Sequence, residues 1–288
     1  MSPLPPPSGG GELGEIPYLR PHPGAALFEA RAARFAALAA GHSLGEFLEF
    51  CGRLAAAQAA AATSLDVPEG AGERPAGRPL DPAAGPGDGW LGALSAIAGE
   101  LEDAPMPAAA RDGLGRVAGL KRPELAALAR ALLSFDFAGL DLAAAPFAAA
   151  ALQVEFAVRA ARIPPASVAR SQRGCPLCGS PPVAAVVLGD DKLRYLACAL
   201  CGSQWHLTRI TCSHCGSNAG ISYLALEGDP GGVKAETCDG CRRYLKVLYL
   251  EHRPASEPEA DDTATLALDE LVAEQGYARA GVNLLLLP

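Results

Sequence analysis

Four Cys-x-x-Cys pairs are the residues of this sequence with the clearest capacity for chemistry. Eight of the nine cysteines belong to them. The pairs are Cys175 with Cys178, Cys198 with Cys201, Cys212 with Cys215, and Cys238 with Cys241. In a reducing compartment, such pairs are metal ligands or redox dithiols far more often than structural disulfides. The ninth cysteine, Cys51, stands alone in an alanine-rich helical pattern, which indicates a small buried apolar side chain.

The spacing between the pairs predicts which of them share a metal ion. Nineteen residues separate the first pair from the second and 22 separate the third from the fourth, and both intervals read as strand, turn, strand. Because a β-hairpin brings its two ends together, a pair at each end supplies four thiolates to one tetrahedral ion, zinc or iron. We therefore predict one site formed by Cys175, Cys178, Cys198 and Cys201, and a second formed by Cys212, Cys215, Cys238 and Cys241. The alternative is a crossed arrangement, the first pair with the third and the second with the fourth.

Glycines support this interpretation at three of the four pairs. Gly179, Gly202 and Gly216 each follow the second cysteine of a pair, where a metal-binding turn demands a positive φ. The fourth pair differs, because Arg242 follows it and the glycine, Gly240, lies inside it. We expect the second site to be more open or differently hydrogen-bonded for that reason.

Other arrangements of reactive residues are weaker. Thioredoxin-like dithiols need βαβ units, which the pattern does not show. His206 is interpreted as a strand-face residue and His214 as solvent-facing, and the acidic pairs at 190–191 and 261–262 as turn and helix-start residues. We find no nucleophile with a base and no phosphate loop, so the sequence predicts no enzyme. Closed all-thiolate sites are structural or transfer electrons, and ligand type alone does not separate zinc from iron.

The elements that must position these pairs indicate an α+β multidomain fold. Its parts are an N-terminal tail (1–22), an all-helical domain (23–168) with a mobile loop (66–89), a first metal-ribbon module (169–210), a second (211–254), and a C-terminal helix and tail (255–288). Apolar spacing, prolines and glycines predict helices near 23–41, 44–63, 90–103, 106–118, 123–135 and 141–162. Short β-rich runs occur at 183–188, 193–198, 204–210, 221–227 and 245–251. We also predict a capping box of Ser43 with Glu46, and an N-terminal cap at residues 261–263 for the last helix.

Composition limits the classes of function. The net charge is −8, and residues 171–253 contain nine Lys or Arg and seven Asp or Glu, which gives little attraction to phosphate. No nucleic-acid partner is therefore expected. The N-terminus lacks the features of a secretory signal, and the most apolar run, 142–154, is too short to span a bilayer. These features predict a soluble, cytoplasmic protein with no membrane contact.

Several stretches resemble one known family. They are "RGCPLCGSPPVAAVV", "LRYLACALCGSQWHLTRITCSHCGS", "AETCDGCRRYLKVLYLE", "DDTATLALDELVAEQGYARAGVN" and the N-terminal "FEARAARFAALAAGHSLGEFLEF". In this order they are similar to the formate dehydrogenase accessory protein FdhE family. The resemblance implies a cytoplasmic maturation factor, chaperone-like, that binds the catalytic subunit of formate dehydrogenase and has no enzymatic reaction of its own. It also implies two tandem rubredoxin-like modules that carry rubredoxin-type iron on the eight paired cysteines, with zinc as the other candidate.

The tips of the metal-binding turns are then the candidate contacts with the client enzyme, since we expect their side chains to be exposed. They are Pro176, Leu177, Ala199, Leu200, Ser213, His214, Asp239 and Gly240. Two other functions fit the cysteine pattern: a rubredoxin-like electron carrier and, less well, a nucleic-acid-binding zinc ribbon. The alanine-rich helical half also offers a surface for self-association.

Overall fold

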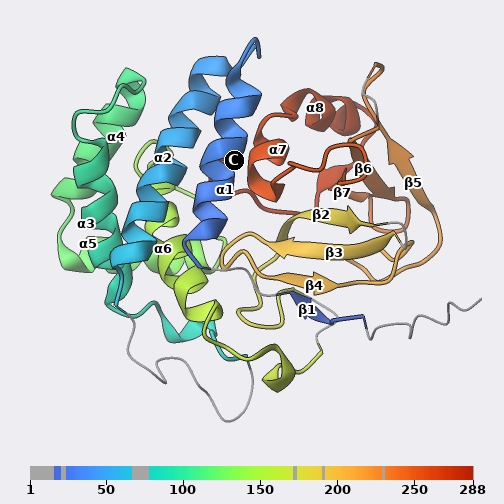
Figure 1. Cartoon of the computed structure of the whole chain (residues 1–288), viewed down its shortest axis with the longest axis horizontal. Coiled ribbons are helices and arrows are strands. Elements are labelled where there is room, and N and C mark those ends of the chain that lie inside the picture. The colour runs from blue at the N-terminus through green and yellow to red at the C-terminus, as the bar shows by residue number, and fades with distance from the viewer. Residues whose placement is uncertain are drawn as a thin grey trace, which may run out of the picture.

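A layer of helices packs beside a β-sheet; of two short C-terminal helices, one lies between the two layers and the other lies against the sheet (Figure 1). The structure is a computed structural model, and it describes residues 16–20, 24–66, 78–170, 174–189, 192–228 and 231–287. Its helices are α1 (Ala26–Ala39), α2 (Gly45–Ser64), α3 (Gly89–Leu101), α4 (Ala108–Gly119), α5 (Arg122–Leu133), α6 (Ala145–Ala160), α7 (Pro258–Thr263) and α8 (Leu266–Glu274), with 3-10 turns at Pro82–Ala84 and Pro165–Ser167. Most of the predicted tail, the centre of the predicted loop (67–77) and the turn residues 190–191 and 229–230 lie outside the described residues.

Helix α6 is the centre of the helical half. Its residues from 147 to 157 are all buried, and they pack against α2, α3, α4 and α5. The many alanines allow this close approach, because small side chains let helix backbones come near one another while favouring the helical conformation. Two polar residues interrupt this apolar surface, Gln153 and Glu155, and both have defined partners. Within the part of the chain that the structure describes, no helix has the length and apolarity needed to cross a membrane.

Two helix starts differ from simple expectation. The predicted capping box of Ser43 and Glu46 is wrong, because the N-cap of α2 is Leu44 and its backbone N–H donates to His42 Nδ1 over 3.0 Å. At α3, the carboxylate of Glu155 accepts hydrogen bonds from the backbone N–H groups of Gly87 (2.6 Å) and Trp90 (2.7 Å). A buried side chain from α6 thus accepts hydrogen bonds from backbone N–H groups at the start of a neighbouring helix. No local sequence pattern predicts this contact.

The sheet joins both predicted metal-ribbon modules. Its strands are β1 (Leu19–Arg20), β2 (Pro182–Leu188), β3 (Leu193–Cys198), β4 (Gln204–His206), β5 (Ile221–Leu224), β6 (Val233–Cys238), β7 (Arg243–Tyr249) and β8 (Ala278–Arg279). They lie in the order β1-β4-β3-β2-β7-β6-β5, with β8 beside β7. Hairpin pairs are antiparallel, but β2 and β7 pair in parallel, with Ala185 opposite Val247. The modules are therefore halves of one continuous sheet.

The C-terminal region forms two helices where the sequence predicted one. Helix α7 is almost wholly buried between α1 and the sheet, whereas α8 packs on β6 (Figure 1). The predicted cap at residues 261–263 is wrong, because those residues lie inside α7. Its cap is Glu257, whose carboxylate accepts from the N–H groups of Glu259 and Ala260. The acidic residues 261 and 262 are consequently part of the core rather than a solvated helix start.

Candidate metal centres

The eight paired cysteines gather into two clusters of four. One cluster contains Cys175, Cys178, Cys198 and Cys201, and the other contains Cys212, Cys215, Cys238 and Cys241. The first cysteine pair thus converges with the second, and the third with the fourth, as the hairpin argument predicted. The crossed alternative is wrong. We call them site 1 and site 2. Among the described residues, these are the two groups of metal-binding side chains that converge.

The distances between sulfurs fit one tetrahedral ion in each cluster. Neighbouring Sγ atoms lie 3.4 to 3.7 Å apart in site 1 and 3.7 Å apart in site 2. A zinc ion bound to four thiolates at about 2.3 Å places its sulfurs about 3.8 Å from one another. A disulfide would need about 2.05 Å. The donor set and its size therefore fit a closed tetrathiolate site in each cluster.

Backbone geometry at the turns explains how the sulfurs converge. The N–H groups of Leu200 and Cys201 point at Cys198 Sγ over 3.4 Å, and those of His214 and Cys215 point at Cys212 Sγ over 3.4 and 3.5 Å. Such N–H groups stabilise the negative charge of a thiolate. The turns thus prepare the sulfurs to bind a cation.

The residue after each pair has a positive φ, as predicted for the glycines. The φ angles are +80° at Gly179, +71° at Gly202 and +78° at Gly216, and Arg242 adopts +54° at the equivalent position. The fourth pair therefore makes the same turn as the others, despite lacking the glycine. The Arg242 guanidinium lies over the ring of Tyr277, 3.9 Å from its centroid, and donates to the carbonyl of Gln275 over 2.7 Å. These contacts offset part of the strain of a left-handed non-glycine residue.

The two sites differ in how deeply their cysteines are buried. The site 1 cysteines are 0 to 3% exposed, whereas in site 2 Cys215 is exposed and Cys241 is half-buried. Burial raises the pKa of Cys175 and Cys198 well above the ordinary value. Burial acts in the same direction on Cys178, but hydrogen bonds from the neighbouring thiols hold the pKa of Cys178 well below its ordinary value.

The tips of the site 1 turns are not exposed, contrary to expectation. Leu177 and Leu200 belong to the same apolar core as the helical half. The carbonyl of Leu177 accepts from the N–H of Leu80 over 2.9 Å, and the carbonyl of Ala199 accepts from Gln153 Nε2 in α6 over 2.8 Å. The exposure expected for the four site 1 tips is therefore wrong: the residues concerned are Pro176, Leu177, Ala199 and Leu200, all of them buried.

The site 2 tips lie at the surface. His214, Asp239 and Gly240 are exposed, and Ser213 is half-buried. An open pocket of about 580 Å³ adjoins Ser213 and His214, and its lining also includes Cys215, Cys241 and Gly179. His206 lies in β4 and packs its ring edge against Tyr195, and burial lowers its pKa. This agrees with the interpretation of His206 as a strand-face residue. Cys51 is 1% exposed within α2, as predicted.

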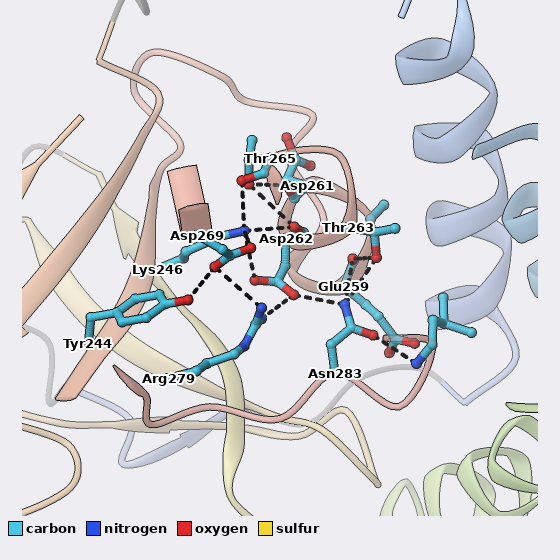
Figure 2. Close-up of polar contacts among 12 residues, drawn as sticks. Tyr244, Lys246, Glu259, Asp261, Asp262, Thr263, Thr265, Asp269, Arg279 and Asn283 are labelled. Carbon is cyan, nitrogen blue, oxygen red and sulfur yellow. Dashed lines mark hydrogen bonds and ion pairs between the residues drawn. The ribbon is translucent and has the colours of Figure 1, made fainter. Parts of the chain in front are cut away.

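A buried network of charges, which the sequence analysis did not predict, connects the helical half to the sheet through α7. Figure 2 shows the part of it between α7 and the sheet. On the helical side, Arg31 pairs with Glu257 and Glu259 at 3.1 and 2.8 Å. Arg34 binds both oxygens of Asp261, at 2.5 and 2.8 Å. All three carboxylates belong to α7 or to its cap.

On the sheet side of α7, two cations bind a second set of carboxylates. Lys246 Nζ lies 2.6 Å from Asp269 and 3.4 Å from Asp262. Arg279 also pairs with both carboxylates, and Asn283 donates to Asp262 over 2.8 Å. Helix α7 is thus held by cations on both of its sides. The run of acidic residues 257, 259, 261 and 262 in one short helix is the sequence signal that could have indicated a buried charged element.

The network also reaches site 1. Gln153 Nε2 donates both to the carbonyl of Ala199 and, over 2.9 Å, to Glu259. Burial raises the pKa of Glu259 to about 7, against the opposing attraction of Arg31. One amide in α6 therefore connects the turn of the first metal site with the charged helix.

Fold and site together define a class of protein in which a helical domain carries a single sheet with two tetracysteine clusters. Comparison with known proteins gives the family. The chain matches the models of FdhE, N-terminal, over residues 16–173, of FdhE, central domain, over 174–209, and of FdhE, C-terminal domain, over 210–286. This chain belongs to the FdhE family.

Individual relatives agree with the family match. The chain is 39% identical over 282 residues to a Protein FdhE homolog of Serratia proteamaculans, a match that covers 91% of this chain and 88% of the relative. It is 37% identical over 279 residues to Protein FdhE of Escherichia coli O157:H7, with the same coverage of both chains. The crystal structure of the FdhE protein from Pseudomonas aeruginosa superimposes with a TM-score of 0.84 at 35% identity, covering 94% of this chain and 99% of that one.

Proposed function

We propose that this protein is a cytoplasmic accessory factor that binds the catalytic subunit of formate dehydrogenase and is required for the maturation of that enzyme. The observation that carries the proposal is the match to all three FdhE domain models in chain order. The protein has no enzymatic reaction of its own in this proposal.

Each cysteine cluster holds one metal ion in a rubredoxin-like module, with iron as the favoured ion and zinc as the other candidate. The modules correspond to residues 169–210 and 211–254, between the helical domain (23–168) and the C-terminal segment (255–288). The sulfur spacing and the N–H groups directed at Cys198 and Cys212 support this assignment. When bound, the ion fixes turns that are too small to be stable through apolar burial alone.

The client-binding surface is formed at site 2. Because the site 1 tips are buried against the helical half, the surface candidates are Ser213, His214, Asp239 and Gly240. Site 1 then acts indirectly, by holding the sheet against the helices. A charge reversal, Asp239→Lys, should weaken capture of the purified catalytic subunit at least tenfold. The matched control is Asp103→Lys, an exposed residue just after α3 in the helical half, which should leave capture unchanged. Equal capture by both variants would refute this surface.

A complementation experiment tests the function itself. Cells that lack their own copy of the protein receive the parent chain, a variant with Cys178→Ser and Cys215→Ser, or the control Cys51→Ala. The parent and the control should restore formate dehydrogenase activity, whereas the double variant should not. Full activity with both clusters disrupted would overturn the requirement for the metals. Absence of restoration by the parent chain would overturn the proposed function.

An electron carrier is the second candidate, because the exposed Cys215 brings the site 2 metal close to solvent. A reversible one-electron titration of the purified protein, coupled to a reductase, would favour it. A metal that does not respond to dithionite would exclude it. The third candidate, a nucleic-acid-binding zinc ribbon, would be supported by a salt-sensitive shift of DNA in a gel when the protein is added. Self-association stays a prediction, which light scattering of the purified chain would test.

A further inference from the structure

The two clusters have the same ligands and the same turns, but their surroundings are opposite. In site 1, Cys175 and Cys201 are 0% exposed, and Cys178 and Cys198 are 1% and 3% exposed. In site 2, Cys238 is 1% exposed, but the Cys215 sulfur belongs to an exposed residue. A sulfur that leaves the metal in site 1 would remain as an unsolvated group in the core, which carries a large free-energy cost. At Cys215, water can solvate the sulfur that leaves.

The glycines after the pairs show the same contrast. A Cβ built on Gly179, in site 1, would lie 2.6 Å from Arg78 Nη1, so the Arg78 side chain covers this turn. A Cβ built on Gly216, in site 2, would meet no atom of the described chain within 4 Å. Both residues have nearly the same φ, +80° and +78°. The difference therefore comes from what covers the turns rather than from the turns themselves.

An open pocket leads to the site 2 sulfurs. Its volume is about 580 Å³, and its lining includes Ser213, His214, Cys215 and Cys241 together with Arg78. This volume accommodates a ligand of the size of a small peptide thiol. The guanidinium of Arg78 gives the pocket a cationic side, which favours a thiol that also carries a carboxylate.

We propose that site 2 is a ligand-exchange site, at which an external carboxylated thiol replaces Cys215 on the metal, while site 1 is a permanent structural site. The inference rests on the proposed binding of a metal at both clusters. In the exchange, the sulfur of the incoming thiol forms a bond to the metal, the bond from the metal to Cys215 breaks, and the thiol proton passes to Cys215. The metal keeps four sulfur ligands and its charge, and nothing is oxidised or reduced.

Metal content and cysteine mapping test the proposal on the full-length, metal-loaded protein. Glutathione serves as the probe thiol, followed by a short pulse of excess iodoacetamide and mass spectrometry of the peptides. Labelling of Cys215 should rise with glutathione concentration and then saturate, at least tenfold above labelling of any site 1 cysteine, while two metal ions per chain remain. A metal chelator should remove one ion at least tenfold faster than the other.

Two variants and one control separate the outcomes. Cys215→Ser should lose the fast chelator-sensitive ion and keep the slow one, whereas Cys51→Ala should behave as the parent. Arg78→Ala should raise the glutathione concentration needed for half-maximal labelling several-fold without changing metal content. Loss of both ions at equal rates, labelling of site 1 first, or labelling independent of glutathione would overturn the exchange site. A purified chain that binds no metal at all would instead overturn the metal assignment under the proposed function.

Discussion

Replacing Lys246 by methionine should destabilise the protein by about 3–5 kcal/mol, the usual cost of removing one partner from a buried ion pair. Lys246 is 1% exposed and its Nζ donates to the carbonyls of Asp262 (2.9 Å) and Thr265 (3.0 Å) and to the carboxylate of Asp269 (2.6 Å). Methionine has a similar volume, so the change creates little empty space. It leaves buried acceptors without a donor, and it leaves Arg279 as the one described cation for two carboxylates.

The assay is urea unfolding of the metal-loaded protein, compared with Arg116→Met as a control. Arg116 pairs with Asp141 at the surface, with both side chains about half exposed, and such pairs contribute about 0.2–1 kcal/mol. In the double variant Lys246→Met with Asp269→Asn, one of the uncompensated charges is gone. Its loss of stability should therefore be smaller than the sum of the single losses. A loss below about 1 kcal/mol for Lys246→Met, or strict additivity in the double variant, would refute the electrostatic reasoning.

Three further outcomes are expected. Burial raises the pKa of Glu259 from the ordinary 4.5 to about 7, so the folded state holds a proton that the unfolded state has lost, and this residue makes stability fall as the pH rises through that window. The free energy of unfolding of Glu259→Gln, measured by urea titration, should therefore rise relative to that of the parent between about pH 5.5 and about pH 8. A difference between the two free energies that does not change with pH would contradict this. Glu155→Ala removes one buried and one partly buried hydrogen bond to the start of α3 and should cost about 2–4 kcal/mol, against about 1 kcal/mol for Glu124→Ala at the exposed start of α5. Gly174→Ala places a Cβ 2.3 Å from a backbone oxygen, at φ +69°, and should lower the metal content of site 1. Gly216→Ala has a similar φ of +78° but meets no neighbouring atom, so it should cost only about 1–2 kcal/mol and keep the site 2 metal. Equal loss of metal in the two variants would argue against steric packing as the cause.

The clusters and the main elements could be predicted because their signals are local. Cysteines at the two ends of a hairpin converge wherever the hairpin lies in the molecule, so the spacing alone indicated the correct grouping. The six N-terminal helices follow apolar spacing and breaker residues to within a few positions. Two local cap predictions failed. At α2 the side chain that accepts from the N-terminal backbone is His42 rather than Ser43. Residues 261–263 lie inside α7, whose cap is Glu257, and the N-cap of α8 is Thr265.

What the sequence could not indicate depends on contacts between distant segments. The parallel pairing of β2 with β7 joins strands that belong to different modules, and no periodicity encodes it. The burial of the site 1 tips depends on Leu80 and Gln153, which lie far from the cysteines along the chain. An Ala-Leu tip on a metal-binding turn has the same composition whether it faces water or a helix. Local residue types therefore did not distinguish the covered site from the open one.

The position of α7 has a consequence for biosynthesis. Arg31 lies 226 residues before Glu257, and both are buried in the finished protein. Domains generally fold in order from the N-terminus as they emerge from the ribosome. When the helical half has been synthesised, the carboxylates of α7 that pair with its arginines have therefore not yet been made. Until α7 has been synthesised, the two arginines of α1 remain without their carboxylates. Docking of α1 onto α7 is thus a late step in folding, and chains truncated before residue 257 should remain sensitive to proteases in α1.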